Sequence, residues 1–123
     1  MNTPKEMAEL AVRALDGKNA RNIRLLRTAD VTVLADYFVI CTATSTTQIK
    51  TLADACEAAL EAAGENKLHR EGYRSGSWVL LDYGCLVIHL FMEEARKFYN
   101  LERLWADAEE VDISGLMGPE QQA

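Results

Sequence analysis

Residues 37–64 have the sequence YFVICTATSTTQIKTLADACEAALEAAG, and this stretch decides the fold class. Its first five residues are apolar and rich in aromatic and β-branched side chains, which predicts a strand that is covered on both faces. Ser45 and Gln48 have the spacing of a helix capping box. The apolar residues after Gln48 recur at helical spacing as far as Gly64, so the sequence predicts that a helix follows the strand directly.

Further elements lie on both sides of this strand–helix unit. Residues 78–82 and 86–91 are strongly apolar, and the short connection between them predicts an antiparallel hairpin. A strand, a helix and a second strand in one sheet require a parallel pair with a right-handed crossover. Near the start of the chain, Thr3 and Glu6 have capping-box spacing and predict a first helix.

Shorter elements complete the predicted domain. Strands are expected at 23–27 and, at a sheet edge, at 67–71, and one or two short helices are expected over 98–105. The sequence therefore predicts an α/β fold, with a single domain, a mixed sheet of about five strands and flanking helices. We place this domain at residues 1–106 and expect residues 107–123 to form an acidic, flexible C-terminal tail.

Charge is unevenly distributed along the chain. The 123 residues carry a net charge of −6, and residues 107–123 hold five carboxylates and no Lys or Arg. Residues 1–106 therefore carry a net charge of only −1. Binding to a phosphate backbone rests on clustered Lys and Arg, so we expect little direct binding to nucleic acid. A basic protein surface would suit this chain better as a partner.

Two features of the sequence bear on where the protein works. No apolar run approaches the ~18 residues that a membrane span needs, so we expect no membrane association. Cys41, Cys56 and Cys85 make an odd number with long spacings, which predicts free thiols and no disulfide framework. Free thiols are typical of a reducing compartment, and we expect the protein to be cytoplasmic.

Residues that could support catalysis are few. His69 and His89 are too far apart for a paired metal site, no glycine-rich phosphate loop is present, and the apolar stretch around His89 is typical of a core or interface histidine. Asp36 and Asp82 lie at the ends of predicted strands and could hold magnesium, but neither has a second acid two residues away on the same face. We therefore expect no cofactor, no metal and no enzymatic activity. The alternative is a small nucleotidyltransferase-like enzyme that uses Asp36 and Asp82.

Aromatic residues in the second half of the chain are the best candidates for a protein interface. Trp78 begins a predicted strand beside a Gly-Ser turn, and Tyr99 and Trp105 lie in the predicted terminal helices. Tyr and Trp are enriched at interface hot spots, although each of these residues could instead belong to the core. We assign partner binding to Trp78, Leu80, Tyr99, Glu102 and Trp105.

Four segments together resemble a known family. They are DYFVICTATS at 36–45, GYRSGSWVLLDYG at 72–84, VIHLF at 87–91 and FYNLERLWAD at 98–107. In this order and spacing they are similar to the ribosomal silencing factors, the RsfS or Iojap family. The family usually has Gly where this chain has Ala43, so we expect ordinary backbone angles at that position.

The resemblance implies a translational repressor and not an enzyme. It implies binding to the large ribosomal subunit through large-subunit ribosomal protein fourteen, which would sterically block joining with the small subunit, notably in starved cells. It also implies a link to large-subunit biogenesis and a homodimer when the chain is unbound. The implied fold is similar to that of nucleotidyltransferases, and the missing acid pair agrees with a non-catalytic relative. A structural dimer with no ribosomal role is a third interpretation.

Overall fold

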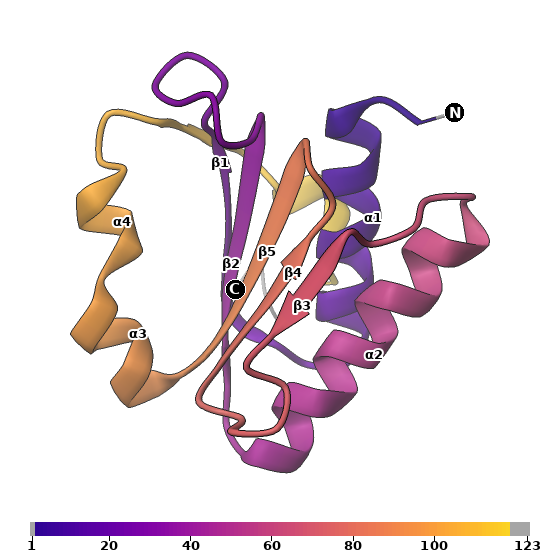
Figure 1. The fold of residues 1–123 in the computed structure, drawn as a ribbon, viewed down its shortest axis with the longest axis vertical. Helices are drawn as coiled ribbons and strands as arrows, with labels where there is room; N and C mark the ends of the chain where they lie inside the picture. The colour runs from indigo at the N-terminus through magenta and orange to yellow at the C-terminus, as the bar shows by residue number, and fades with distance from the viewer. Residues whose placement is uncertain (1, 119–123) are drawn as a thin grey trace.

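The computed structural model describes residues 2–118, which form one sheet with helices on both faces (Figure 1). The helical elements are α1 (Pro4–Gly17), α2 (Thr46–Ala62), α3 (Glu93–Tyr99), α4 (Leu101–Leu104) and the short 3-10 helix η1 (Ser114–Leu116). The strands are β1 (Arg21–Arg27), β2 (Tyr37–Ala43), β3 (His69–Glu71), β4 (Trp78–Asp82), β5 (Leu86–Met92) and β6 (Glu109–Val111).

The sheet is mixed, as the sequence predicts. Its six strands lie in the order β3-β4-β5-β2-β1-β6, which is one strand more than expected. β2 and β5 run parallel, so α2 belongs to the crossover between them, whereas β4 and β5 form the predicted antiparallel hairpin. The α/β fold class is confirmed. No helix within residues 2–118 is both long enough and apolar enough to span a membrane.

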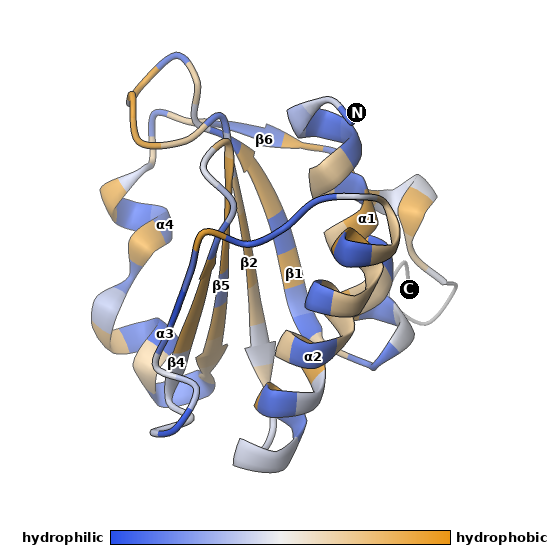
Figure 2. Cartoon of the chain, turned by 45° about the vertical axis from the view of Figure 1, so that its right-hand side comes forward, coloured by the Kyte–Doolittle hydropathy of each residue, from blue (hydrophilic) through white to orange (hydrophobic). Residues whose placement is uncertain are grey.

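The two faces of the sheet are covered by different helices. Figure 2 shows α1 and α2 on one side of the sheet and α3 and α4 on the other. Because side chains alternate along a strand, β2 and β5 each contribute to both faces. Towards α1 and α2 the strands and helices form the larger core, whose fully buried members include Val12, Leu15, Val39, Leu52, Leu60, Ile88 and Leu90.

Helix starts follow local hydrogen bonding. The Thr3 hydroxyl accepts from the Glu6 backbone N–H, and the Glu6 carboxylate accepts from the Thr3 backbone N–H, which confirms the first capping box. The Ser45 hydroxyl caps α2 by accepting from the Gln48 N–H at 3.0 Å. The Gln48 side-chain Oε1 instead accepts from the Thr44 N–H at 2.6 Å, so the second capping box has only one of its two expected bonds.

Residues 107–118 belong to the domain, and the prediction of a tail starting at residue 107 is wrong for them. β6 pairs with β1, with Val111 opposite Leu25, and Ile113 is buried in the larger core. The Gly118 N–H donates to the Asp16 carboxylate at 2.9 Å, which ties this segment to the end of α1. The acidic composition concealed the few apolar residues that pack here. The rest of the expected tail, 119–123, lies outside the described residues.

Candidate partner-binding surface

One face of the sheet gathers aromatic side chains from three strands. In the β4–β5 pair Trp78 lies opposite Phe91, and Leu80 lies opposite His89. Residues opposite one another in a sheet share a face, so these four side chains all point towards α3 and α4. Phe38 joins them from β2, and Tyr99 and Trp105 approach from the helices. We call Phe38, Trp78, His89, Phe91, Tyr99 and Trp105 the aromatic cluster.

Ring contacts hold the aromatic cluster together. The Trp78 ring is stacked on Phe91, with ring centroids 5.0 Å apart, and its centroid is 4.5 Å from that of Tyr99. Phe38 makes edge contacts with His89 at 5.0 Å and with Trp105 at 5.5 Å. Aromatic pairs of this geometry contribute about 0.5–1.5 kcal/mol each beyond the area that they bury. Phe38 and Phe91 of the cluster, with Trp78 and Trp105 packed against them, belong to a second core that is smaller than the core beneath α1 and α2.

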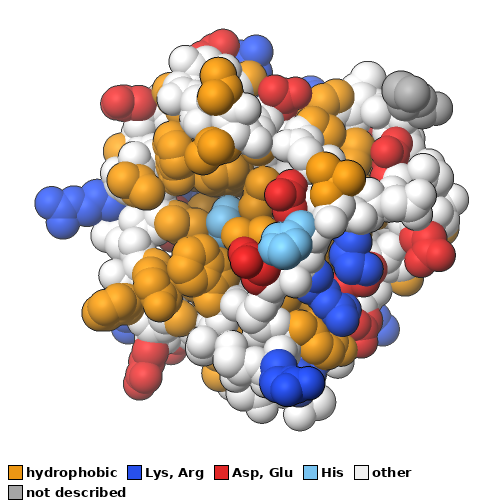
Figure 3. Space-filling view, viewed as in Figure 1, with side chains coloured by type: hydrophobic (Ala, Val, Ile, Leu, Met, Phe, Trp, Pro, Cys, Tyr) orange, Lys and Arg blue, Asp and Glu red, His pale blue; other side chains and the backbone are white. Residues whose placement is uncertain are grey.

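The outer side of this second core is open to solvent. Phe98 is 82% exposed, Leu104 69% and Tyr99 50%, while Trp78, Leu80 and Trp105 are half-buried. Figure 3 shows hydrophobic side chains gathered over the region of α3, α4 and the neighbouring strands. Contiguous exposed apolar groups on a single chain mark interaction sites. We call Trp78, Leu80, Phe98, Tyr99, Leu104 and Trp105 the apolar surface.

The loop before Trp78 packs tightly against the start of β4. Gly72 has a φ of +80°, and a Cβ at this position would lie 1.9 Å from the Trp78 carbonyl oxygen. Only glycine fits such a close approach of two backbone segments. The Ser77 carbonyl accepts from the Met92 N–H at 2.9 Å, so the loop is also bonded to the end of β5. The backbone at Trp78 is therefore fixed from both sides.

His89 is the buried polar residue of the aromatic cluster. The residue is 4% exposed, and its Nδ1 accepts a hydrogen bond from the Trp78 indole Nε1–H at 3.2 Å. An indole nitrogen is a donor only, so Nδ1 must be unprotonated and the proton of the neutral ring is on Nε2. Burial lowers the pKa of His89 to about 4. The ring is therefore neutral at physiological pH.

The burial of His89 predicts a pH dependence of folding. The pKa of His89 is about 4 in the folded chain, against an ordinary value of about 6.5, so between these values the unfolded chain binds the proton better. Above about pH 6.5 His89 is neutral in both the folded and the unfolded chain, so protonation costs the fold nothing. As the pH falls towards 4, protonation of His89 in the unfolded chain increasingly favours unfolding. We expect the free energy of unfolding to fall by about 2 kcal/mol between pH 7 and pH 5 from this group. Urea denaturation should show this slope, and His89→Leu should flatten it.

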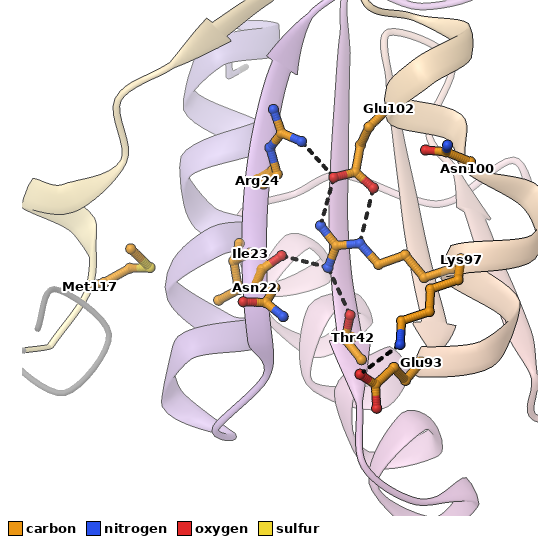
Figure 4. Close-up of a pocket in the computed structure, with 10 residues that line it drawn as sticks. Asn22, Ile23, Arg24, Thr42, Glu93, Lys97, Asn100, Glu102 and Met117 are labelled. Atoms are coloured by element: carbon orange, nitrogen blue, oxygen red, sulfur yellow. Dashed lines mark hydrogen bonds and ion pairs between the residues drawn. The ribbon is translucent and has the colours of Figure 1, made fainter.

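Ion pairs help to attach α3 and α4 to the sheet. Neither helix has a fully buried residue, so apolar packing alone gives a weak attachment. The Arg96 guanidinium donates to both carboxylate oxygens of Glu102 at 3.0 and 3.1 Å, and to the Thr42 hydroxyl and the Asn22 carbonyl at 2.7 Å. Arg24 of β1 also bonds Glu102, as Figure 4 shows. Hydrogen bonds from Arg96, then from Arg24, hold the pKa of Glu102 below its ordinary value. This network fixes the helices that carry Tyr99 and Trp105.

A cavity of about 660 Å³ lies between β1, β2 and α3, and this network lines it (Figure 4). Arg24 and Arg96 both pair with Glu102, Arg24 also pairs with Glu110, and Lys97 lies 3.6 Å from Glu93, so each of these three cations has an acidic partner. An anionic ligand would have to displace these internal pairs. The charged side chains that line the cavity are therefore the ones that attach α3 and α4 to the sheet.

The carboxylates of the alternative enzymatic interpretation, Asp36 and Asp82, lie near the amino ends of the two parallel strands. The Asp82 carboxylate accepts from the Gly84 N–H at 2.8 Å and shapes the β4–β5 turn. Asp36 precedes β2, so both acids lie where the parallel strands β2 and β5 begin. Ligands of open α/β sheets bind at the opposite, carboxyl ends of such strands. Within residues 2–118 no group of three or more His, Cys, Asp or Glu side chains is placed to hold a metal ion.

The structure brings together most of the residues that the sequence nominates. Trp78 and Tyr99 are in direct ring contact, Leu80 lies beside them, and Trp105 joins through Phe38. Glu102 is different, because both its carboxylate oxygens bond arginines of the same chain, so it positions α4. Sequence reasoning missed Phe38, Phe91, Arg96, Phe98 and Leu104. A period-two pattern in the central strands could have indicated Phe91, which stands two residues after His89.

Comparisons with known proteins identify the family of this chain. The chain matches the model of a family described as "Ribosomal silencing factor during starvation" over residues 1–123. The chain belongs to the RsfS family. The ribosomal silencing factor RsfS of Halalkalibacterium halodurans is 35% identical over 113 residues, which cover 92% of this chain and 97% of that protein. The RsfS of Bacillus subtilis is 35% identical over 109 residues, 89% of this chain and 92% of that protein.

More distant relatives and solved structures extend the RsfS family. The mouse "mitochondrial assembly of ribosomal large subunit protein 1" is 31% identical over 100 residues, 79% of this chain and 44% of that protein. A crystal structure of a Chromobacterium violaceum protein superposes with a TM-score of 0.83 at 33% identity and covers 85% of this chain and 88% of that one. The names in the RsfS family indicate a regulatory factor of ribosome silencing or assembly and not an enzyme.

Proposed function

We propose that this chain binds the large ribosomal subunit and sterically blocks its joining with the small subunit, which represses translation in the cytoplasm. The direct partner is large-subunit ribosomal protein fourteen, as the resemblance implies, and the contact lies on the apolar surface. Relatives named for ribosomal silencing and for large-subunit assembly support a role in the starvation response and in large-subunit biogenesis. We also propose that the unbound chain forms a homodimer.

The apolar surface is the observation that carries this proposal. Soluble monomers rarely expose contiguous apolar patches larger than a few hundred Å² unless the patch has a partner. Trp78 and Tyr99 lie in ring contact there, and residues of these types dominate the binding energy of interfaces. A standard protein interface buries about 800 Å² per partner. The described fold has 6904 Å² of accessible surface, so this domain can provide such an area.

Acidic residues beside the apolar surface favour a basic partner. Glu71 of the edge strand β3 lies directly opposite Leu80, and its side chain is exposed. Asp82 follows two residues later on the same face of β4. Carboxylates at the rim of an interface steer a basic protein into position and add modestly to its affinity. The −6 charge of the whole chain acts in the same direction.

The rim charge predicts a salt-dependent affinity. We expect binding to large subunits to weaken as the salt concentration rises to physiological values, where the Debye length falls to about 8 Å. Glu71→Gln should weaken binding a few-fold at low salt and reduce the salt dependence. The control Glu61→Gln also removes one negative charge, but from α2 on the other side of the sheet. It should leave the affinity and its salt dependence unchanged. An affinity that stays flat with salt would exclude the electrostatic contribution.

An order-of-addition experiment tests the proposed function. Purified large subunits are mixed with the chain, small subunits are added, and joined ribosomes are measured by sucrose-gradient sedimentation. We expect the fraction of joined ribosomes to fall in proportion to the occupancy of the large subunits. The same amount of chain bound first to small subunits should have little effect. Normal joining at full occupancy of the large subunit would reject the steric mechanism.

Asp82→Asn separates this function from the enzymatic alternative. The Asn carbonyl can still accept the Gly84 N–H, so the turn is preserved, while the negative charge that a metal-dependent reaction needs is lost. We expect the variant to inhibit subunit joining with at most a few-fold loss of affinity. Complete loss of inhibition in a folded variant that still binds large subunits would instead support a catalytic role.

A further inference from the structure

The Trp78 side chain has one polar atom, and the chain itself satisfies it. The indole Nε1–H donates to His89 Nδ1 at 3.2 Å, beneath the apolar surface. An indole nitrogen can only donate, so this single bond uses the whole hydrogen-bonding capacity of the side chain. The half-buried ring can then be covered by another molecule without leaving an unpaired donor behind.

The stability of the fold does not explain why residue 89 is a histidine. Its Nε2 carries the proton of the neutral ring, is buried, and has no hydrogen-bond partner within residues 2–118. A buried donor without an acceptor destabilises a folded protein, and an apolar side chain in its place avoids that loss. Leu90 and Phe91 beside it in β5 are apolar and fully buried. The stability of the folded chain therefore does not explain a histidine at this position.

We propose that His89 is a positioning residue for partner binding, which occupies the Trp78 indole N–H in advance so that the whole ring can be buried against an apolar patch of the partner. This inference rests on the proposed function. Without His89, docking would bury an unpaired donor or require the partner to supply an acceptor at this point. In the free chain the same N–H, on a half-buried ring, could turn to water. His89 therefore matters in the complex more than in the folded monomer.

Three variants of the full chain test this role. His89→Leu removes the acceptor, His89→Gln retains an acceptor in its side-chain carbonyl, and the double variant Trp78→Phe/His89→Leu removes donor and acceptor together. Affinity for purified large subunits and the thermal melt are measured for each. A proton–nitrogen NMR spectrum follows how fast the Trp78 indole N–H exchanges with water. Exchange should be slow in the wild type and fast in His89→Leu.

The expected pattern is specific to a positioning role. His89→Leu should bind about tenfold more weakly and melt no lower than the wild type, because the unpaired Nε2 is gone. His89→Gln should bind within about threefold of the wild type. The double variant should recover most of the affinity lost in His89→Leu, since removing both partners of a hydrogen bond is nearly neutral.

Other outcomes overturn the inference. If His89→Leu binds as tightly as the wild type, the hydrogen bond has no role in docking. If the double variant stays as weak as His89→Leu, His89 acts by contact or by packing and not through Trp78. If His89→Leu fails to fold, weak binding by a folded His89→Gln also rejects the inference. A wild-type chain that does not bind large subunits rejects the proposed function itself, whereas the outcomes above reject only the role of His89.

Discussion

Trp78→Ala is expected to weaken binding to the large ribosomal subunit by about thirtyfold or more. The ring is part of the apolar surface and contacts Phe91 and Tyr99, and truncating an aromatic anchor of an interface removes about 2 kcal/mol or more of binding free energy. The ring is half-buried, so we expect the free energy of unfolding to fall by only about 1–2 kcal/mol. A binding titration and a thermal melt on the purified variant separate the two effects.

Tyr73→Ala is the matched control for this prediction. Tyr73 is also a half-buried aromatic residue, but it packs against the larger core and its hydroxyl bonds Asp54 of α2. We expect this variant to bind large subunits with wild-type affinity. If Trp78→Ala melts tens of degrees lower, Trp78 belongs chiefly to the core. If Trp78→Ala has both the melt and the affinity of the wild type, the contact must be sought elsewhere on α3 and α4.

Arg96→Leu is expected to give the largest loss of stability among the variants considered. The Arg96 side chain is 12% exposed, and its removal takes this donor from the Thr42 hydroxyl and the Asn22 carbonyl and leaves Glu102 with Arg24 alone. Breaking a buried ion pair from one side typically destabilises by 3–5 kcal/mol, and partial exposure with the remaining Arg24 contact reduces this to about 2–3 kcal/mol. Urea denaturation measures the loss directly.

The same variant should also weaken partner binding, because α3 and α4, with Trp105 at the end of α4, present four of the six residues of the apolar surface and depend on this network for their position. Lys97→Ala is the control on the same helix, since Lys97 is exposed and, among residues 2–118, its only ion pair is with Glu93 at 3.6 Å. We expect a change of at most about 0.5 kcal/mol for the control. An Arg96→Leu variant as stable as the wild type would show that ring contacts alone hold these helices.

The fold was predictable wherever a local signal is strong. The capping residues Thr3 and Ser45 start α1 and α2 as expected, and the apolar run at 37–41 forms the buried centre of the sheet. β6 was not predictable in this way, because it is three residues long and two of them are Glu. Its place depends on pairing with β1, more than eighty residues earlier, and on the bond between Glu110 and Arg24.

For the candidate site too, local sequence signals indicated some residues, while the rest depend on contacts between distant parts of the chain. Composition alone indicated Trp78, Tyr99 and Trp105, because large aromatic residues near turns and chain ends are typical of interfaces. Their mutual contacts depend on the register of β2, β4 and β5, which no local pattern determines. For that reason only the structure reveals the hydrogen bond between Trp78 and His89. The same holds for the bonds that Glu102 makes to arginines of its own chain. Ala43 is accommodated as an ordinary strand residue opposite Met92.

Co-sedimentation with purified ribosomal subunits tests the central claim most directly. The chain is mixed separately with large and with small subunits at low and at physiological salt, and the pelleted fraction is measured with wild-type chain, Trp78→Ala and Tyr73→Ala. The account predicts that wild type and Tyr73→Ala pellet with large subunits and not with small ones, and that Trp78→Ala remains mostly in the supernatant. Equal pelleting of all three chains with large subunits, or no pelleting of the wild type, would contradict it.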